Sequence, residues 1–107
     1  MTPLELIARA VSDVTGITIE QMRAKGRRED VAYARFMVYS VAAMHHVGSR
    51  TTEDWFGQSH GMSVHAIKKN NLRTAQSKTW SRLMAVAMVK AEVKLKRAFE
   101  NAARIEL

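Results

Sequence analysis

The spacing of apolar residues constrains the fold of this 107-residue chain more than any other feature of its sequence. Apolar side chains recur at positions i, i+3, i+4 and i+7, and in no segment do they alternate over the length of a β-strand. A repeat near 3.6 residues is typical of amphipathic helices that bury one face. The pattern therefore predicts an all-α fold.

Length and composition predict that residues 1–107 form a single folded domain. Hydrophobic residues make up 47% of the chain, with one Pro and five Gly, so there is enough apolar surface for one core. The absence of Cys excludes disulfides, thiolate catalysis and Cys-based zinc sites. The sequence has no apolar run of membrane-spanning length and no signal-peptide pattern, so we expect a cytoplasmic, nucleoid-associated protein without a membrane partner.

Capping residues predict the first two helices. Thr2, Pro3 and Glu5 have the pattern of an N-cap, a first-turn proline and a capping-box acid, and Gly16 is suited to end that helix. A second, short helix is expected over residues 18–26, with the Thr at its start as N-cap.

Four further helices are predicted, which gives about six in all. They span about 29–46, 52–57, 63–75 and 77–104, and the third of them ends before a cap at Ser77 or Thr79. At 1.5 Å per residue the last helix is roughly 40 Å long, which exceeds the width of a domain of this size. Part of it must overhang or bind a partner.

Positive charge is concentrated in the second half of the chain. Seventeen Lys and Arg against ten Asp and Glu give a formal net charge of +7. From Trp55 through Ala91 there is no acidic residue, while this stretch contains the cations Lys68, Lys69, Arg73, Lys78, Arg82 and Lys90. Such a field favours a polyanionic partner, either nucleic acid or an anionic membrane surface.

The same stretch has the pattern of a helix-turn-helix at about residues 52–75. Such a motif needs an apolar and a small residue in its first helix, a Gly in the turn and apolar anchors in its second helix. Phe56, Gly57, Gly61, Met62 and Ile67 follow in that order. The alternative is a plain corner between two helices with a solvated basic face.

If the second helix enters a DNA groove, its outward side chains can be named. We expect the outward set to be Ser63, His65, Ala66, Lys69 and Asn70. Short polar side chains of this kind can approach base edges, while Lys68 and Arg73 would bind phosphates.

The segment "VSDVTGITIEQMRAKGRREDVAYARFMVYSVA", residues 11–42, resembles the C-terminal DNA-binding domain of the bacterial chromosomal replication initiator DnaA. That domain has a short helix, a Ser/Ala-Lys-x-Arg loop, a hydrophobic residue and a Pro/Ala-Arg pair that opens a long central helix. The run from Ala24 to Arg27, then Val31, then the pair Ala34 and Arg35 match this spacing without a gap.

The resemblance implies a Trp-repressor-like helical fold that reads double-stranded DNA. Arg27 would enter the minor groove, Lys25 and Arg35 would bind phosphates, and Ser63 would correspond to the Thr of the family's base-reading motif. Arg28 is a further DNA-binding candidate. The alternative is that Arg28 and the acids that follow it only form a helix start with compensating charges. The motif's Asp-His pair is missing here, so we expect a target sequence different from that of the initiator.

The chain has neither a Gly-x-x-x-x-Gly-Lys-Ser/Thr loop nor a Ser-His-acid order, so we expect no enzyme activity, no cofactor and no metal site. The function predicted from the sequence is a small phage- or mobile-element-type transcriptional regulator that binds duplex DNA sequence-specifically. A homodimer through the last helix would let it span two half-sites. Two alternatives stay open: a protein-interaction adaptor that uses that helix, and a nonspecific architectural DNA binder.

Overall fold

The computed structural model describes residues 1–24 and 26–106, and within them it has six α-helices and no strand. The helices are α1 (Pro3–Thr15), α2 (Ile19–Arg23), α3 (Glu29–Met44), α4 (Ser49–Phe56), α5 (Met62–Gln76) and α6 (Lys78–Glu106). The predicted all-α fold with a long C-terminal helix is therefore confirmed. None of the helices in the described residues has the length and hydropathy needed to cross a membrane.

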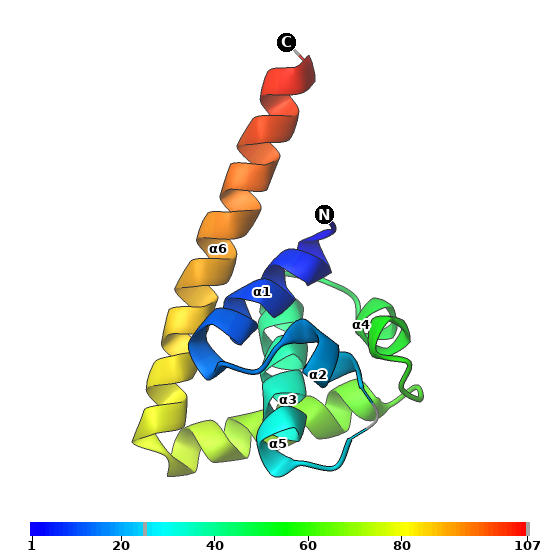
Figure 1. The fold of residues 1–107 in the computed structure, drawn as a ribbon, viewed down its shortest axis with the longest axis vertical. Helices are drawn as coiled ribbons and strands as arrows, with labels where there is room; N and C mark the ends of the chain where they lie inside the picture. Colours follow the sequence, from blue (N-terminus) through cyan, green and yellow to red (C-terminus); the bar gives the residue numbers. More distant parts are fainter. Residues whose placement is uncertain (25, 107) are drawn as a thin grey trace.

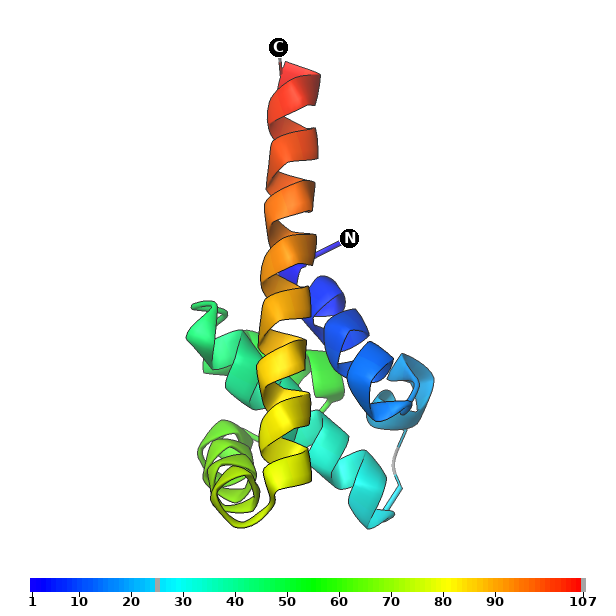
Figure 2. The same ribbon diagram turned by 90° about the vertical axis from the view of Figure 1, so that its left-hand side faces the viewer.

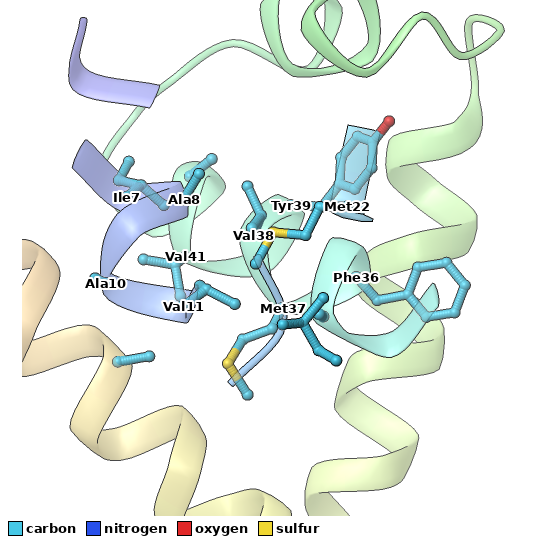
Figure 3. Close-up of a cluster of buried hydrophobic side chains, with 14 of the residues drawn as sticks. Ile7, Ala8, Ala10, Val11, Met22, Phe36, Met37, Val38, Tyr39 and Val41 are labelled. Carbon is cyan, nitrogen blue, oxygen red and sulfur yellow. The ribbon is translucent and has the colours of Figure 1, made fainter. Parts of the chain in front are cut away.

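Helix α3 occupies the centre of the domain. Ten of its sixteen residues are buried, because apolar side chains surround most of its circumference. Figure 1 shows α1 on one side of α3 and α5 crossing it, and α5 packs chiefly on α3. In Figure 3, Val41 of α3 lies against Ala8 and Val11 of α1, while Phe36 points towards α5. Burial of each such large apolar side chain contributes about 1.5–3 kcal/mol.

The caps predicted for the first two helices are present. The hydroxyl of Thr2 accepts the backbone N–H of Glu5 at 3.2 Å, and Gly16 ends α1 with a φ of 75°. At α2, Thr18 Oγ1 accepts the N–H of Gln21 at 3.1 Å, and Gln21 Oε1 accepts the N–H of Thr18 at 2.8 Å. The two bonds form a complete capping box, which starts a helix of only five residues.

Several helix boundaries differ from those predicted. Helix α2 ends at Arg23, short of residue 26. Helix α3 ends at Met44 rather than at residue 46, because His46 takes a positive φ of 61° that ends the regular backbone. Helix α4 starts at Ser49 rather than at residue 52, with Gly48 as its N-cap residue. The Gly-Ser-Arg sequence that separates the helices thus includes the first turn of α4.

Helix α6 packs mainly on α1 and then continues alone. Trp80, Ala87 and Ala91 are buried on its inner face, and Lys94 Nζ lies 3.4 Å from Asp13 Oδ2 of α1. Beyond that contact the helix projects away from the domain in both views (Figures 1 and 2). There Phe99 is 76% exposed. The overhang predicted from the helix length is therefore present.

Candidate nucleic-acid interface

Helices α4 and α5 are joined by a tight turn that two glycines make possible. Gly57 has a φ of 64° and Gly61 a φ of 93°, a region that glycine enters without steric cost. The N–H of Gln58 donates to the carbonyl of Glu53 at 2.9 Å, which closes the end of α4 as in a Schellman motif. The turn also holds α3, because Tyr39 Oη donates to Gln58 Oε1 at 2.7 Å.

A buried carboxylate caps the start of α5. Glu53 Oε2 accepts the N–H of Gly61 at 2.9 Å and that of Ser63 at 3.0 Å. The bond from Ser63 is the largest cause that lowers the pKa of Glu53, and burial opposes it. A carboxylate is also favoured at the positive end of the helix dipole. Helix α5 has no side-chain cap of its own at Gly61, so α4 supplies it and fixes the angle between the two helices.

The side of α5 that faces α3 and α6 is not the side predicted from the sequence. Ser63, Ala66 and Asn70 were expected to point outward, but all three are buried. Ser63 Oγ donates to the carbonyl of Ser49 at 3.3 Å, and Asn70 Oδ1 accepts the N–H of the Trp80 indole at 2.8 Å. The prediction was wrong because small side chains allow α5 to pack closely on the central helix. The buried stripe of α5 therefore consists of small residues rather than large apolar ones.

The exposed face of α5 lies opposite that stripe and is called the outer face below. Its exposed residues are Val64, His65, Lys68, Lys69, Asn71, Leu72, Ala75 and Gln76. His65, Lys68 and Lys69 are thus exposed on α5, as expected, and the ring of His65 also stands edge-on to Phe36 at 5.7 Å. Since the acid-free stretch of the sequence includes all of α5, the outer face carries no negative side chain.

Arg73 lies at the border of the outer face, where its charge is already engaged. Its guanidinium carbon lies 4.0 Å from the ring centroid of Tyr33 and 4.7 Å from that of Trp80. Its Nη1 is 3.6 Å from Glu29 Oε1. These cation–π and ionic contacts stabilise the junction of α3, α5 and α6. Arg73 was expected to bind phosphate, but in this structure its guanidinium makes contacts that hold three helices together.

Arg35 is also structural, in contrast to the expected phosphate contact. It is 9% exposed, and its guanidinium donates to the carbonyls of Met22 at 3.0 Å, Gly26 at 3.3 Å and Ala24 at 3.5 Å. Burial lowers the pKa of its guanidinium. Because the end of α2 and the following loop present their carbonyls inward, Arg35 fixes that loop against α3 and is largely buried.

The remaining basic candidates lie in the loop before α3. Arg28 Nη2 binds Asp30 Oδ2 at 2.6 Å, and this bond is the main cause of the lowered pKa of Asp30. Arg28 therefore compensates an acid at the start of α3, which was the alternative interpretation of this residue. Arg27 is exposed, and Lys25 lies outside the described residues.

The loop before α3 and the turn between α4 and α5 are close to each other in space. Residues of both parts line one surface pocket. Its lining includes Arg23 of α2, Arg27 of the loop and Arg35 of α3, together with Phe56, Gly57 and Gln58 at the end of α4 and in the turn. Arg23 strengthens this contact, since its Nε donates to the carbonyl of Trp55 at 3.1 Å and its guanidinium lies over the Trp55 ring. Both views place α5 and the start of α3 at the end of the molecule opposite the C-terminus (Figures 1 and 2).

Metal ligands do not converge in the part of the chain that the structure describes. His60 Nε2 lies 3.8 Å from Asp54 Oδ1, and both side chains are largely exposed. His65 packs against an aromatic ring on another helix. The two histidines near the turn therefore serve different local contacts.

Sequence reasoning missed Glu53 as the cap of α5 and missed Val64 and Leu72 as members of the outer face. The cap links residues eight and ten positions apart across a turn, so no local pattern reveals it. The exposure of Val64 and Leu72 could have been predicted from the spacing of the small residues of α5. Ser63, Ala66 and Asn70 recur at i, i+3 and i+7, which is the spacing of one helix face, and it places the valine and the leucine on the other side.

In comparisons with known proteins, no family model matches the chain, no curated protein matches its sequence and no solved structure matches its fold.

Proposed function

We propose that the protein binds double-stranded DNA sequence-specifically and that it is a small transcriptional regulator of the phage or mobile-element type. The observation that carries the proposal is the outer face of α5: an exposed, acid-free helix face with Lys68, Lys69 and His65, presented as the second helix of a helix-turn-helix. An α-helix fits the major groove of B-DNA, which is about 12 Å wide. This is the docking geometry of helix-turn-helix proteins.

Charge supports the same partner. The lysines of the outer face contact phosphates or guanine edges, and counterion release makes the affinity fall steeply with salt. Arg27 contributes from the neighbouring loop. Its exposure, and the pocket that it shares with Gly57 and Gln58, favour the minor-groove contact that the resemblance to the DnaA domain implies. Arg28 assists once its pairing with Asp30 is exchanged for a phosphate.

A second copy completes the proposed reader. A single helix in one groove covers few base pairs, and readers of this kind dimerise so that two recognition helices lie about one DNA turn, roughly 34 Å, apart. The overhang of α6, with Phe99 exposed, lies at the end of the chain opposite α5 and provides an apolar surface for that pairing.

The test is selection from a pool of random duplexes at physiological salt, followed by sequencing of the bound fraction. The variant Lys68→Ala with Lys69→Ala should lose the enriched motif and lower the slope of log K against log salt by about 2, since each phosphate contact contributes about 0.9. The matched control is Lys96→Ala, which removes an exposed charge from the overhang of α6. Failure of the wild type to retain any duplex would refute the proposal.

A second candidate function is a protein-interaction adaptor that binds its partner through the overhang. The exposure of Phe99 favours it. Under this alternative Phe99→Ser abolishes function, while the loss of Lys68 and Lys69 has no effect. A nonspecific architectural binder would instead retain duplexes in a salt-sensitive way without enriching a motif.

A further inference from the structure

Two large apolar side chains stand exposed among the cations of the outer face. Val64 is 74% exposed and Leu72 is 52% exposed. They are eight residues apart with Lys68 midway between them, so the three follow one i, i+4 row, which turns about the axis by about 40° at each step. Single exposed apolar residues are ordinary on protein surfaces. Val64 and Leu72 lie on either side of Lys68 on a basic helix face. This arrangement suits a negatively charged partner that also offers apolar groups.

We propose that Val64 and Leu72 read thymine through its 5-methyl group in the major groove. The inference rests on the proposed function, because it assigns base readout to the same face of α5. Thymine presents a methyl group there, next to the O4 acceptor, and apolar side chains contact it. Cytosine has only a C5–H at that position and the purines present the N7 acceptor, so only thymine offers a methyl group to an apolar side chain.

The geometry sets the spacing of the thymines. Eight residues of α-helix rise about 12 Å, and successive base pairs of B-DNA are about 3.4 Å apart. That spacing is measured along the DNA axis, and a helix that lies along the groove is inclined to this axis, so Val64 and Leu72 meet bases at most about three to four steps apart. Lys68 falls between them and supplies a donor to a guanine edge or a phosphate. The target thus has two thymine methyl groups within that separation on the major-groove side.

Charge disfavours a second copy of this chain as the occupant of this row. A second copy that paired through the same face would bring Lys68 and Lys69 against their own equivalents. The stretch from Trp55 through Ala91 has no acid that could compensate them. In a DNA groove the same lysines face phosphates, and the apolar side chains face the methyl groups. Duplex DNA is therefore the partner that suits both halves of the pattern.

The experiment compares two syntheses of the duplex that the random pool enriches most, one with thymidine and one with deoxyuridine, which lacks only the 5-methyl group. Dissociation constants are measured for the wild type, for Val64→Ser with Leu72→Ser, and for the control Val89→Ser. Val89 is an exposed valine of α6 outside the proposed interface. All replaced residues are exposed, and circular dichroism verifies that each variant is folded.

We expect the wild type to bind the deoxyuridine duplex about fourfold more weakly for each contacted methyl group, the factor that corresponds to about 0.8 kcal/mol for one buried CH₂. In the double variant the two duplexes should bind equally, and Val89→Ser should behave like the wild type. Equal binding of both duplexes by the wild type would overturn the inference and leave DNA binding intact. A ratio that persists in the double variant would also overturn it, because the methyl group would then act through DNA shape. No binding to either duplex refutes the proposed function itself.

Discussion

The carboxylate of Glu53 in α4 accepts the backbone N–H of Ser63 in α5 at 3.0 Å, so one buried side chain couples the orientation of the two helices. The same oxygen also holds Gly61 at the turn. A change in this carboxylate therefore alters both the stability of the domain and the angle at which the outer face is presented.

Acid should weaken the fold through Glu53. Its pKa in the folded state lies below the ordinary value of 4.5, chiefly because of the bond from Ser63, so near that pH the unfolded chain binds the extra proton. Stability from this group is complete above pH 4.5 and is lost as the pH falls through the folded-state pKa. In Glu53→Gln the melting temperature should be lower at neutral pH, and the remaining acid dependence should be smaller than in the wild type.

The control for Glu53 is Glu92→Gln, which changes an exposed carboxyl of α6. It should melt as the wild type does at neutral pH. Thermal unfolding followed by circular dichroism at several pH values between neutral and acid gives the comparison. Identical melting curves for Glu53→Gln and the wild type over this range would mean that the cap contributes nothing.

Local features of this fold could be predicted from the sequence, and contacts across turns could not. The caps at Thr2, Gly16 and Thr18 depend on residues within four positions of one another, so their sequence pattern is sufficient. The length of α6 and its overhang also follow from an unbroken helical repeat. In contrast, the bonds of Arg35 join α3 to a loop nine to thirteen residues away, which periodicity does not register.

The two helices of the candidate site could be predicted in their position along the chain but not in their orientation. The turn glycines correctly indicated two helices joined by a turn, and the acid-free stretch indicated that the second of them has no acidic side chain. The predicted rotation of α5 about its axis was wrong. Ser63 and Asn70 are polar and were expected to face solvent, but both are buried with hydrogen-bond partners. Polar residues can occupy a buried stripe when a partner elsewhere in the chain satisfies them, and that partner is known only from the fold.

The bond between Trp80 and Asn70 should contribute measurably to stability. Asn70→Ala leaves the buried indole N–H without its acceptor and should lower the free energy of unfolding by about 1–3 kcal/mol. The neighbouring Asn71→Ala changes an exposed side chain and should remain within about 0.5 kcal/mol of the wild type. Urea unfolding measures both. Equal losses of unfolding free energy in the two variants would show that the buried bond does not contribute to stability.

Replacement of Arg35 and replacement of Arg27 should have opposite effects on stability and on DNA binding. Arg35→Met removes the donors to three carbonyls and should lower the free energy of unfolding by about 1.5–3 kcal/mol, while the salt slope of DNA binding is unchanged. Arg27→Met should do the reverse, with little loss of stability and weaker DNA binding. Urea unfolding and a salt titration of DNA affinity supply the two readouts. A lower salt slope in Arg35→Met, with stability intact, would restore the phosphate role.

The overhang of α6 should determine whether the protein pairs with a second copy. Its exposed or partly exposed apolar side chains continue the stripe that α1 covers nearer the domain, and they are Leu95, Ala98, Phe99 and Ala102. If two overhangs pair, Phe99→Ser removes one large apolar contact from each copy and should weaken the dimer on the order of a hundredfold. Val89→Ser changes an exposed valine on another face of α6 and should leave the dimer constant unaltered. Sedimentation velocity over a range of protein concentrations, with and without the selected duplex, measures the effect. A wild-type protein that stays monomeric under both conditions would exclude pairing and leave Phe99 available for a different protein.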